Sequence, residues 1–107
     1  MYKITVVALA SCEQCASLTS KLKEGNIEFN IADANAHESL CDMLEVLLDT
    51  KKYPIVTFEI PQRAYFICMP NNADRMGWKV LDGTSTSIGV LSIDEIYNTI
   101  IELKSKL

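Results

Sequence analysis

A short apolar run near the N-terminus ends close to two cysteines that are separated by two residues. Residues 3–9 are apolar apart from Lys3 and Thr5 and are largely β-branched, which is typical of a strand buried on both faces. Cys12 and Cys15 follow it, and a helical pattern over residues 15–24 ends at Gly25. The cysteine pair therefore lies where a strand passes into a helix, so the fold must begin with a strand–helix unit.

The rest of the chain predicts an α/β domain with the element order β-α-β-α-β-β-α. After the first helix we expect a strand over 27–31, a helix over 38–49, strands over 55–60 and 64–69, and a last helix after Ser92. The first two strands are joined through a helix and are therefore parallel, whereas a short turn makes the next two antiparallel. The expected architecture is a four-stranded mixed sheet with helices on both faces.

Two helices carry predicted core stripes. In the second helix the stripe is Leu40, Met43, Leu44 and Leu47. In the last helix it is Ile93, Ile96, Tyr97, Ile100 and Leu107. Ser92 and Glu95 form a capping box that sets the start of the last helix.

The length of 107 residues predicts a single domain over 1–107, since one core typically serves about 100–150 residues. Residues 70–87 contain glycine, asparagine and a run of serine and threonine, and they exceed the usual loop length. We expect an extended insertion there, with one short turn around Trp78, which anchors the loop on the core.

The charge and hydropathy of the chain give no indication of nucleic-acid or membrane partners. Ten Lys and Arg against 14 Asp and Glu give a net charge of −4, and no basic block indicates nucleic acid. No segment reaches the roughly 18–20 apolar residues of a membrane span. Residues 9–12 resemble a lipoprotein cleavage pattern, but the apolar run before them is shorter than a signal segment. The expectation is a soluble, cytoplasmic monomer.

The cysteine pair indicates thiol–disulfide chemistry. At the start of a helix, free N–H groups and the positive end of the dipole favour the thiolate of Cys12, the species that attacks a disulfide. One helical turn brings Cys15 within reach, so Cys15 is the expected resolving thiol. The carboxylate of Glu13 opposes ionisation of Cys12, so we expect a less acidic thiol and a more reducing disulfide.

A zinc site is the alternative use of the pair, with His37 and Cys41 as the other ligands. Nothing in the sequence directs those two residues towards Cys12, and a chain of this size needs no metal for stability, so no metal is expected. Cys41 and Cys68 are predicted to be buried free thiols.

Pro54 begins the strand after the second helix. Together with the cysteine pair it favours a cis bond beside the active site, with the backbone of Tyr53 exposed to the sulfur-containing segment of a substrate.

Taken together, these motifs resemble the glutaredoxin family, within the thioredoxin-like fold, over residues 1–69 and 88–107. The matching segments are residues 6–9, Cys12-Glu13-Gln14-Cys15, residues 51–56 and Gly89. Glu13-Gln14 replaces the usual Pro-Tyr of this family. The glutamine at position 14 resembles the motif of the glutaredoxin-like redoxins, which serve ribonucleotide reductase and take electrons from thioredoxin reductase.

The resemblance implies a small oxidoreductase in electron transport, which reduces protein or glutathione mixed disulfides through a redox-active Cys12–Cys15 disulfide. Glutathione or a flavoprotein reductase would donate the electrons, with glutathione as a co-substrate and no tightly bound cofactor. The implied substrate-binding residues are Gln14, Lys51, Lys52, Tyr53, Pro54 and the backbone near Ile93 and Asp94. The protein substrate would be one such as ribonucleotide reductase.

Two alternatives stay open from the sequence. One is a non-catalytic thioredoxin-fold module that binds a partner through the proline edge and residues 70–87. The other is an iron–sulfur-binding glutaredoxin with Cys12 and glutathione as ligands.

Overall fold

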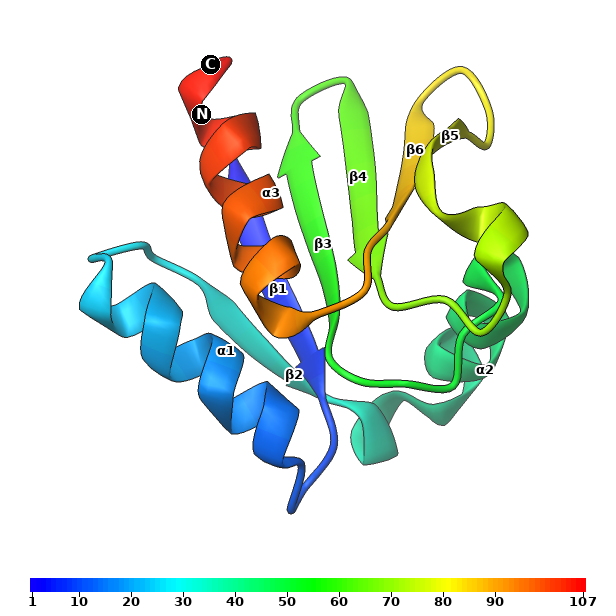
Figure 1. Ribbon diagram of the computed structural model, residues 1–107, viewed down its shortest axis with the longest axis horizontal. Helices are drawn as coiled ribbons and strands as arrows, with labels where there is room; N and C mark the ends of the chain where they lie inside the picture. The colour runs from blue at the N-terminus through cyan, green and yellow to red at the C-terminus, as the bar shows by residue number, and fades with distance from the viewer.

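The computed structural model describes all 107 residues, and its six strands form one mixed sheet (Figure 1). The strands are β1 (Lys3–Ala8), β2 (Asn30–Asp33), β3 (Ile55–Ile60), β4 (Arg63–Cys68), β5 (Gly77–Val80) and β6 (Ser85–Gly89). The helices are α1 (Glu13–Glu24), α2 (Glu38–Leu48) and α3 (Ile93–Ser105), with short 3-10 helices η1 (Ala34–His37) and η2 (Ala73–Arg75). The spatial order of the strands is β2-β1-β3-β4-β6-β5.

Helices cover both faces of the sheet, and each face has its own apolar core. Leu18 and Leu22 of α1 pack with Ile96 and Ile100 of α3 against one face, in a cluster of 14 buried residues. Helix α2 covers the other face, in a cluster of nine. The alternation along β3 serves both clusters, because successive side chains of a strand point to opposite faces.

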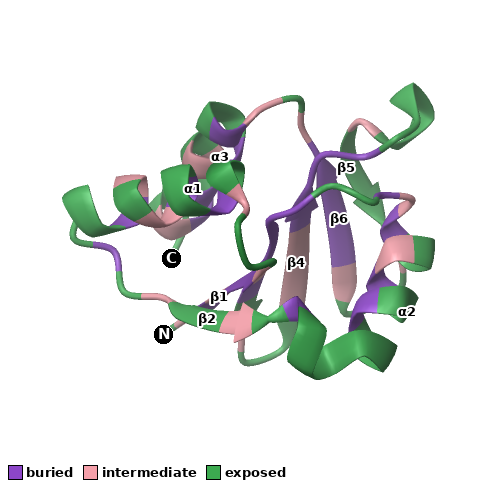
Figure 2. Cartoon of the chain, turned by 90° about the horizontal axis from the view of Figure 1, so that it is seen from below, coloured by how far each residue is buried: buried purple, intermediate pink, exposed green.

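The strand pairing around β1 agrees with the predicted order of elements. Strand β1 pairs in parallel with β2, to which it is connected through α1, and antiparallel with β3. Strands β3 and β4 form the predicted antiparallel hairpin. Figure 2 shows β1 and β6 coloured as buried, whereas the edge strands β2 and β5 are mostly exposed.

The predicted four-stranded sheet is wrong, because residues 70–87 are not an extended connection. They contain η2, β5 and part of β6, and β6 pairs in parallel with β4 while β5 pairs with β6. Asp82 closes the tight turn between β5 and β6 by accepting hydrogen bonds from the backbone of Thr84 and Ser85. The sequence signal for these strands is weak, because they are only four and five residues long and β6 consists mainly of serine and threonine.

Trp78 lies on β5 rather than at a turn. Its ring is 46% exposed and packs edge-on against Tyr65, with 5.9 Å between the ring centroids. The ammonium group of Lys106 lies 4.9 Å from the centre of the indole ring. Trp78 therefore joins the added strand to β4 and to the end of α3.

The core stripe predicted for α2 is only partly correct. Leu44 is buried, but Leu40, Met43 and Leu47 are exposed. The helix instead buries Cys41 and Leu48. The helix has apolar residues on two adjoining sides, so spacing alone does not decide which side faces the sheet.

The second strand begins later than predicted, at Asn30 instead of residue 27. Ile27 is buried in the connection before it, whereas Ile31 is 60% exposed on the outer strand of the sheet. The alternation of apolar residues therefore continues through a segment of which only the last part is a strand.

The last helix follows its capping signal. The Ser92 hydroxyl accepts a hydrogen bond from the Glu95 backbone N–H. In return, the Glu95 carboxylate accepts a hydrogen bond from the Leu91 backbone N–H. Its predicted stripe is buried at Ile93, Ile96 and Ile100 and half-buried at Tyr97, whereas Leu107 is 59% exposed. None of the three helices has the length and apolarity needed to cross a membrane.

Replacing Gly89 should destabilise the added part of the sheet. Gly89 is buried between Cys68 and Gly77, and a Cβ atom there would lie 3.0 Å from Met76 Cα and collide with the Arg75 carbonyl. We expect Gly89→Ala to lower the free energy of unfolding by about 1–3 kcal/mol, measured by urea denaturation.

Gly83→Ala is the matched control, since no atom lies within 4 Å of the added methyl group. It should leave stability unchanged or raise it by up to about 1 kcal/mol. Equal stability of the two variants would contradict the close approach of Arg75.

Candidate active site

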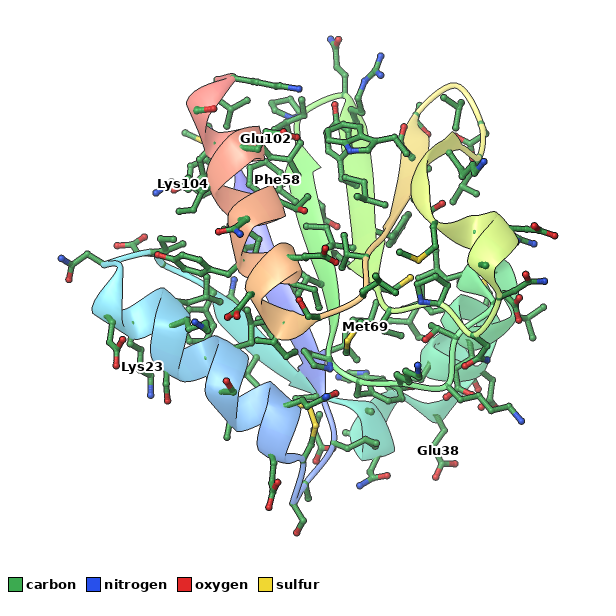
Figure 3. All side chains as sticks on the ribbon, viewed as in Figure 1. Lys23, Glu38, Phe58, Met69, Glu102 and Lys104 are labelled. Atoms are coloured by element: carbon green, nitrogen blue, oxygen red, sulfur yellow. A yellow bond between two sulfur atoms is a disulfide. The ribbon has the colours of Figure 1, made fainter.

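The cysteine pair forms a disulfide at the first turn of α1, visible as a yellow bond in Figure 3. The two Cα atoms are 5.2 Å apart. Helix α1 begins at Glu13, so Cys12 is its N-cap, and the Sγ of Cys12 accepts a hydrogen bond from the Cys15 backbone N–H at 3.1 Å. The sulfur of Cys12 therefore occupies the place where a capping oxygen usually satisfies a free N–H group.

The two cysteines differ in their access to solvent. Cys15 is 4% exposed and belongs to the apolar cluster on the α2 side of the sheet. Cys12 is only half-buried and packs at the margin of that cluster. A disulfide that arrives from outside can reach Cys12 more easily than Cys15.

The turn before β3 lies beside this sulfur. The Tyr53–Pro54 peptide bond is cis, and both residues are buried. The carbonyl oxygen of Tyr53 lies 3.7 Å from Cys12 Sγ. The fold therefore brings together Cys12, Tyr53 and Pro54, which are about forty residues apart along the chain.

Two side chains hold this turn in place. The hydroxyl of Thr50, which has no exposed surface, donates to the Met69 carbonyl at 2.7 Å and accepts from the Lys52 N–H at 3.1 Å. The hydroxyl of Tyr53 donates to Glu45 of α2 at 2.8 Å. Burial, together with this hydrogen bond, raises the pKa of Tyr53, which keeps its hydroxyl protonated as a donor.

The structure does not bring together all the substrate-binding residues predicted from the sequence. Gln14, Lys51 and Lys52 are exposed near the cysteine pair and the turn. Ile93 is buried in the core, and Asp94 forms an ion pair of 2.8 Å with Lys21 of α1.

Two surface concavities adjoin the Cys12–Tyr53 contact, and Leu9 lines both. One, of about 410 Å³, lies between α1 and β2 and contains Cys12 and Ile31. The other, of about 350 Å³, lies beside α2 and contains Tyr53 and Lys51. Neither Ile93 nor Asp94 lines them.

Sequence reasoning missed Ile31 as a site residue. The alternation of apolar residues placed it in a strand but did not show that this strand is the outermost one. Only the sheet order, which leaves one edge of β2 free, shows that its side chain lies beside the cysteine pair.

The other two cysteines are free and buried. No group of three or more His, Cys, Asp or Glu side chains is arranged to hold a metal ion. The zinc alternative would have needed Cys41 and His37 to join the cysteine pair, but His37 is exposed in η1 and Cys41 packs against the sheet. Burial raises the pKa of Cys68 to about 11.

No protein-family model, curated protein or solved structure matches the chain.

Removing the Thr50 hydroxyl should weaken the turn that carries Tyr53 and Pro54. We expect Thr50→Val to cost about 1–3 kcal/mol of unfolding free energy, because it leaves the buried Met69 carbonyl without its partner and removes the acceptor of the Lys52 N–H. Urea denaturation measures this. The control Thr99→Val removes a hydroxyl that donates only to the Glu95 carbonyl of its own helix. A loss of stability as large as that of Thr50→Val would contradict the role of the Thr50 hydroxyl in holding the turn.

Cys68 should be inert in the native, reduced protein. At pH 7 a thiol with a pKa of about 11 is a thiolate in only about one molecule in ten thousand, and Cys68 is also 2% exposed. We expect iodoacetamide to modify Cys12 and leave Cys68 intact until the chain is unfolded, as measured by peptide mass spectrometry. Its labelling should rise as the pH approaches 11, and labelling at the rate of Cys12 at pH 7 would contradict its burial.

Proposed function

We propose that the protein is a small thiol–disulfide oxidoreductase of the glutaredoxin type, with a thioredoxin-like core. The elements β1-α1-β2-α2-β3-β4-α3, with the strand order β2-β1-β3-β4, support this core, and β5 and β6 extend it. The observation that carries the proposal is the Cys12–Cys15 disulfide at the start of α1, with the Tyr53 carbonyl 3.7 Å from Cys12 Sγ.

In the reduced protein Cys12 is the attacking group. Its thiolate accepts the Cys15 N–H and lies at the positive end of α1, and both interactions favour the negative charge. It attacks one sulfur of the substrate disulfide, a new bond joins Cys12 to that sulfur, and the other sulfur leaves as a thiolate and takes a proton from water.

Cys15 completes the exchange. Its thiolate attacks Cys12 Sγ, the Cys12–Cys15 disulfide forms, and the second half of the substrate leaves as a thiol. The protein dithiol loses two electrons, and the substrate disulfide gains them. The burial of Cys15 supports this order, because the resolving thiol needs to reach only its neighbour.

The oxidised protein then needs two electrons from a second donor. Two molecules of glutathione, oxidised to glutathione disulfide, or a flavoprotein reductase would supply them. Lys51 beside Tyr53 supports an anionic donor, whereas the neighbouring carboxylates of Glu38, Asp42 and Glu45 oppose one.

Single cysteine variants should separate the two roles. We expect Cys12→Ser to remove all turnover of a model disulfide, assayed with glutathione plus glutathione reductase and separately with thioredoxin reductase. Cys15→Ser should retain the first attack and accumulate a mixed disulfide on Cys12, detected by intact mass.

Cys68→Ala is the control and should keep wild-type turnover, because Cys68 is a buried free thiol that takes no part in the Cys12–Cys15 disulfide. Inactivity of the wild-type protein with both donors would contradict the proposed function and favour a module that only binds a partner. Turnover retained in Cys12→Ser would contradict the role of Cys12.

A further inference from the structure

The concavity between α1 and β2 has the character of a side-chain pocket. Its apolar walls include Leu9, Ala16 and Ile31, and Cys12 lies in the same lining. Its volume of about 410 Å³ is at the small end of the roughly 300–1,000 Å³ of ligand sites. Leu9 and Ile31 are 38% and 60% exposed, so an apolar group placed there would remove their surface from water.

The charges around the site disfavour glutathione as the group that fills this pocket. Glu13 is the one charged residue of the pocket lining, and no lysine or arginine takes part in it. In the neighbouring concavity three carboxylates face one lysine, Lys51. Figure 3 shows Glu38, one of the three, at the same end of the molecule as the disulfide. Glutathione is a net anion at neutral pH, so this surrounding field repels it.

The edge of the sheet beside the pocket suits a polypeptide. Strand β2 is the outermost strand and pairs only with β1, so its outer backbone groups have no partner within the sheet. An extended segment can pair with such an edge while its alternate side chains enter a neighbouring pocket. The side chain of Ile31 and the sulfur of Cys12 both lie at this pocket, so a segment bound there would have its own cysteine near Cys12.

On the basis of the proposed function, we infer that the substrate is a polypeptide disulfide with an apolar residue next to its reacting cysteine. That residue occupies the pocket formed by Leu9, Ala16 and Ile31. Cys12 attacks the sulfur of the bound segment and Cys15 then releases it as a thiol, with the electron balance given above. The pocket therefore selects a protein substrate over a glutathione mixed disulfide.

Two chromogenic substrates test the inference, each a mixed disulfide with thionitrobenzoate, which is released on attack and measured by absorbance. One is a synthetic octapeptide with leucine on both sides of a single cysteine, and the other is glutathione. The full-length protein, kept reduced by dithiothreitol at a concentration whose background rate is subtracted, should react with the octapeptide at a kcat/KM about tenfold higher or more.

Ile31→Asn, which removes the apolar surface without adding charge, should lower kcat/KM for the octapeptide by about tenfold and leave that for the glutathione substrate within about twofold of wild type. The conservative variant Ile31→Leu should keep the wild-type preference. The control Val80→Asn changes a residue that is 78% exposed on the opposite edge strand, and it should alter neither rate.

The outcomes distinguish failure of this inference from failure of the proposed function. Release from neither substrate by the wild-type protein would overturn the proposed function. Equal rates on both substrates, or an octapeptide rate that Ile31→Asn leaves unchanged, would overturn the pocket assignment while leaving the thiol–disulfide chemistry intact. Loss of both rates in Ile31→Asn, with the fold unchanged by circular dichroism, would show that Ile31 supports the position of the cysteine pair, and it would also overturn the pocket.

Discussion

Strand β1 is buried on both faces, and this burial positions the residues around the cysteine pair. Val6 packs beneath α1 and α3, and Val7 packs on the side of α2. Because apolar surface on both faces must be covered, helices are needed on both sides of the strand. The end of β1 therefore lies where α1, β2 and the turn before β3 meet, and the chain that leaves it reaches Cys12 within four residues.

The redox chemistry proposed for this site depends on two supports that come from different directions. Along the chain, the first turn of α1 offers an N–H group to Cys12 Sγ. Across the chain, Thr50 and Glu45 hold the turn whose Tyr53 carbonyl lies beside that sulfur. The first support is local and would exist in any helix that begins after a cysteine. The second depends on the packing of α2 and of the end of β4, and so on the complete domain.

The candidate site could be predicted from the sequence only where its residues carry a local signal. The spacing of Cys12 and Cys15 at a strand–helix junction is such a signal, and so is Ser92 at the start of α3, whose capping bond is present. The exposure of Ile31 has no local signal, because the sequence pattern of an apolar residue in a strand is the same whether the strand is central or at the edge of the sheet. The two added strands were missed because they are only four and five residues long and β6 consists mainly of serine and threonine.

The sequence by itself determined the order of the elements from β1 to β4, the position of the cysteine pair at the start of a helix and the capped start of α3. These features depend on interactions between residues a few positions apart, so they can be recognised from local sequence patterns. The tertiary structure decided the number of strands in the sheet, the side of α2 that faces it and the neighbours of Cys12. Those depend on residues that are distant in sequence, such as Ile31 and Cys12 in the lining of one pocket, or Tyr53 beside Cys12. Such residues meet only when both apolar cores form.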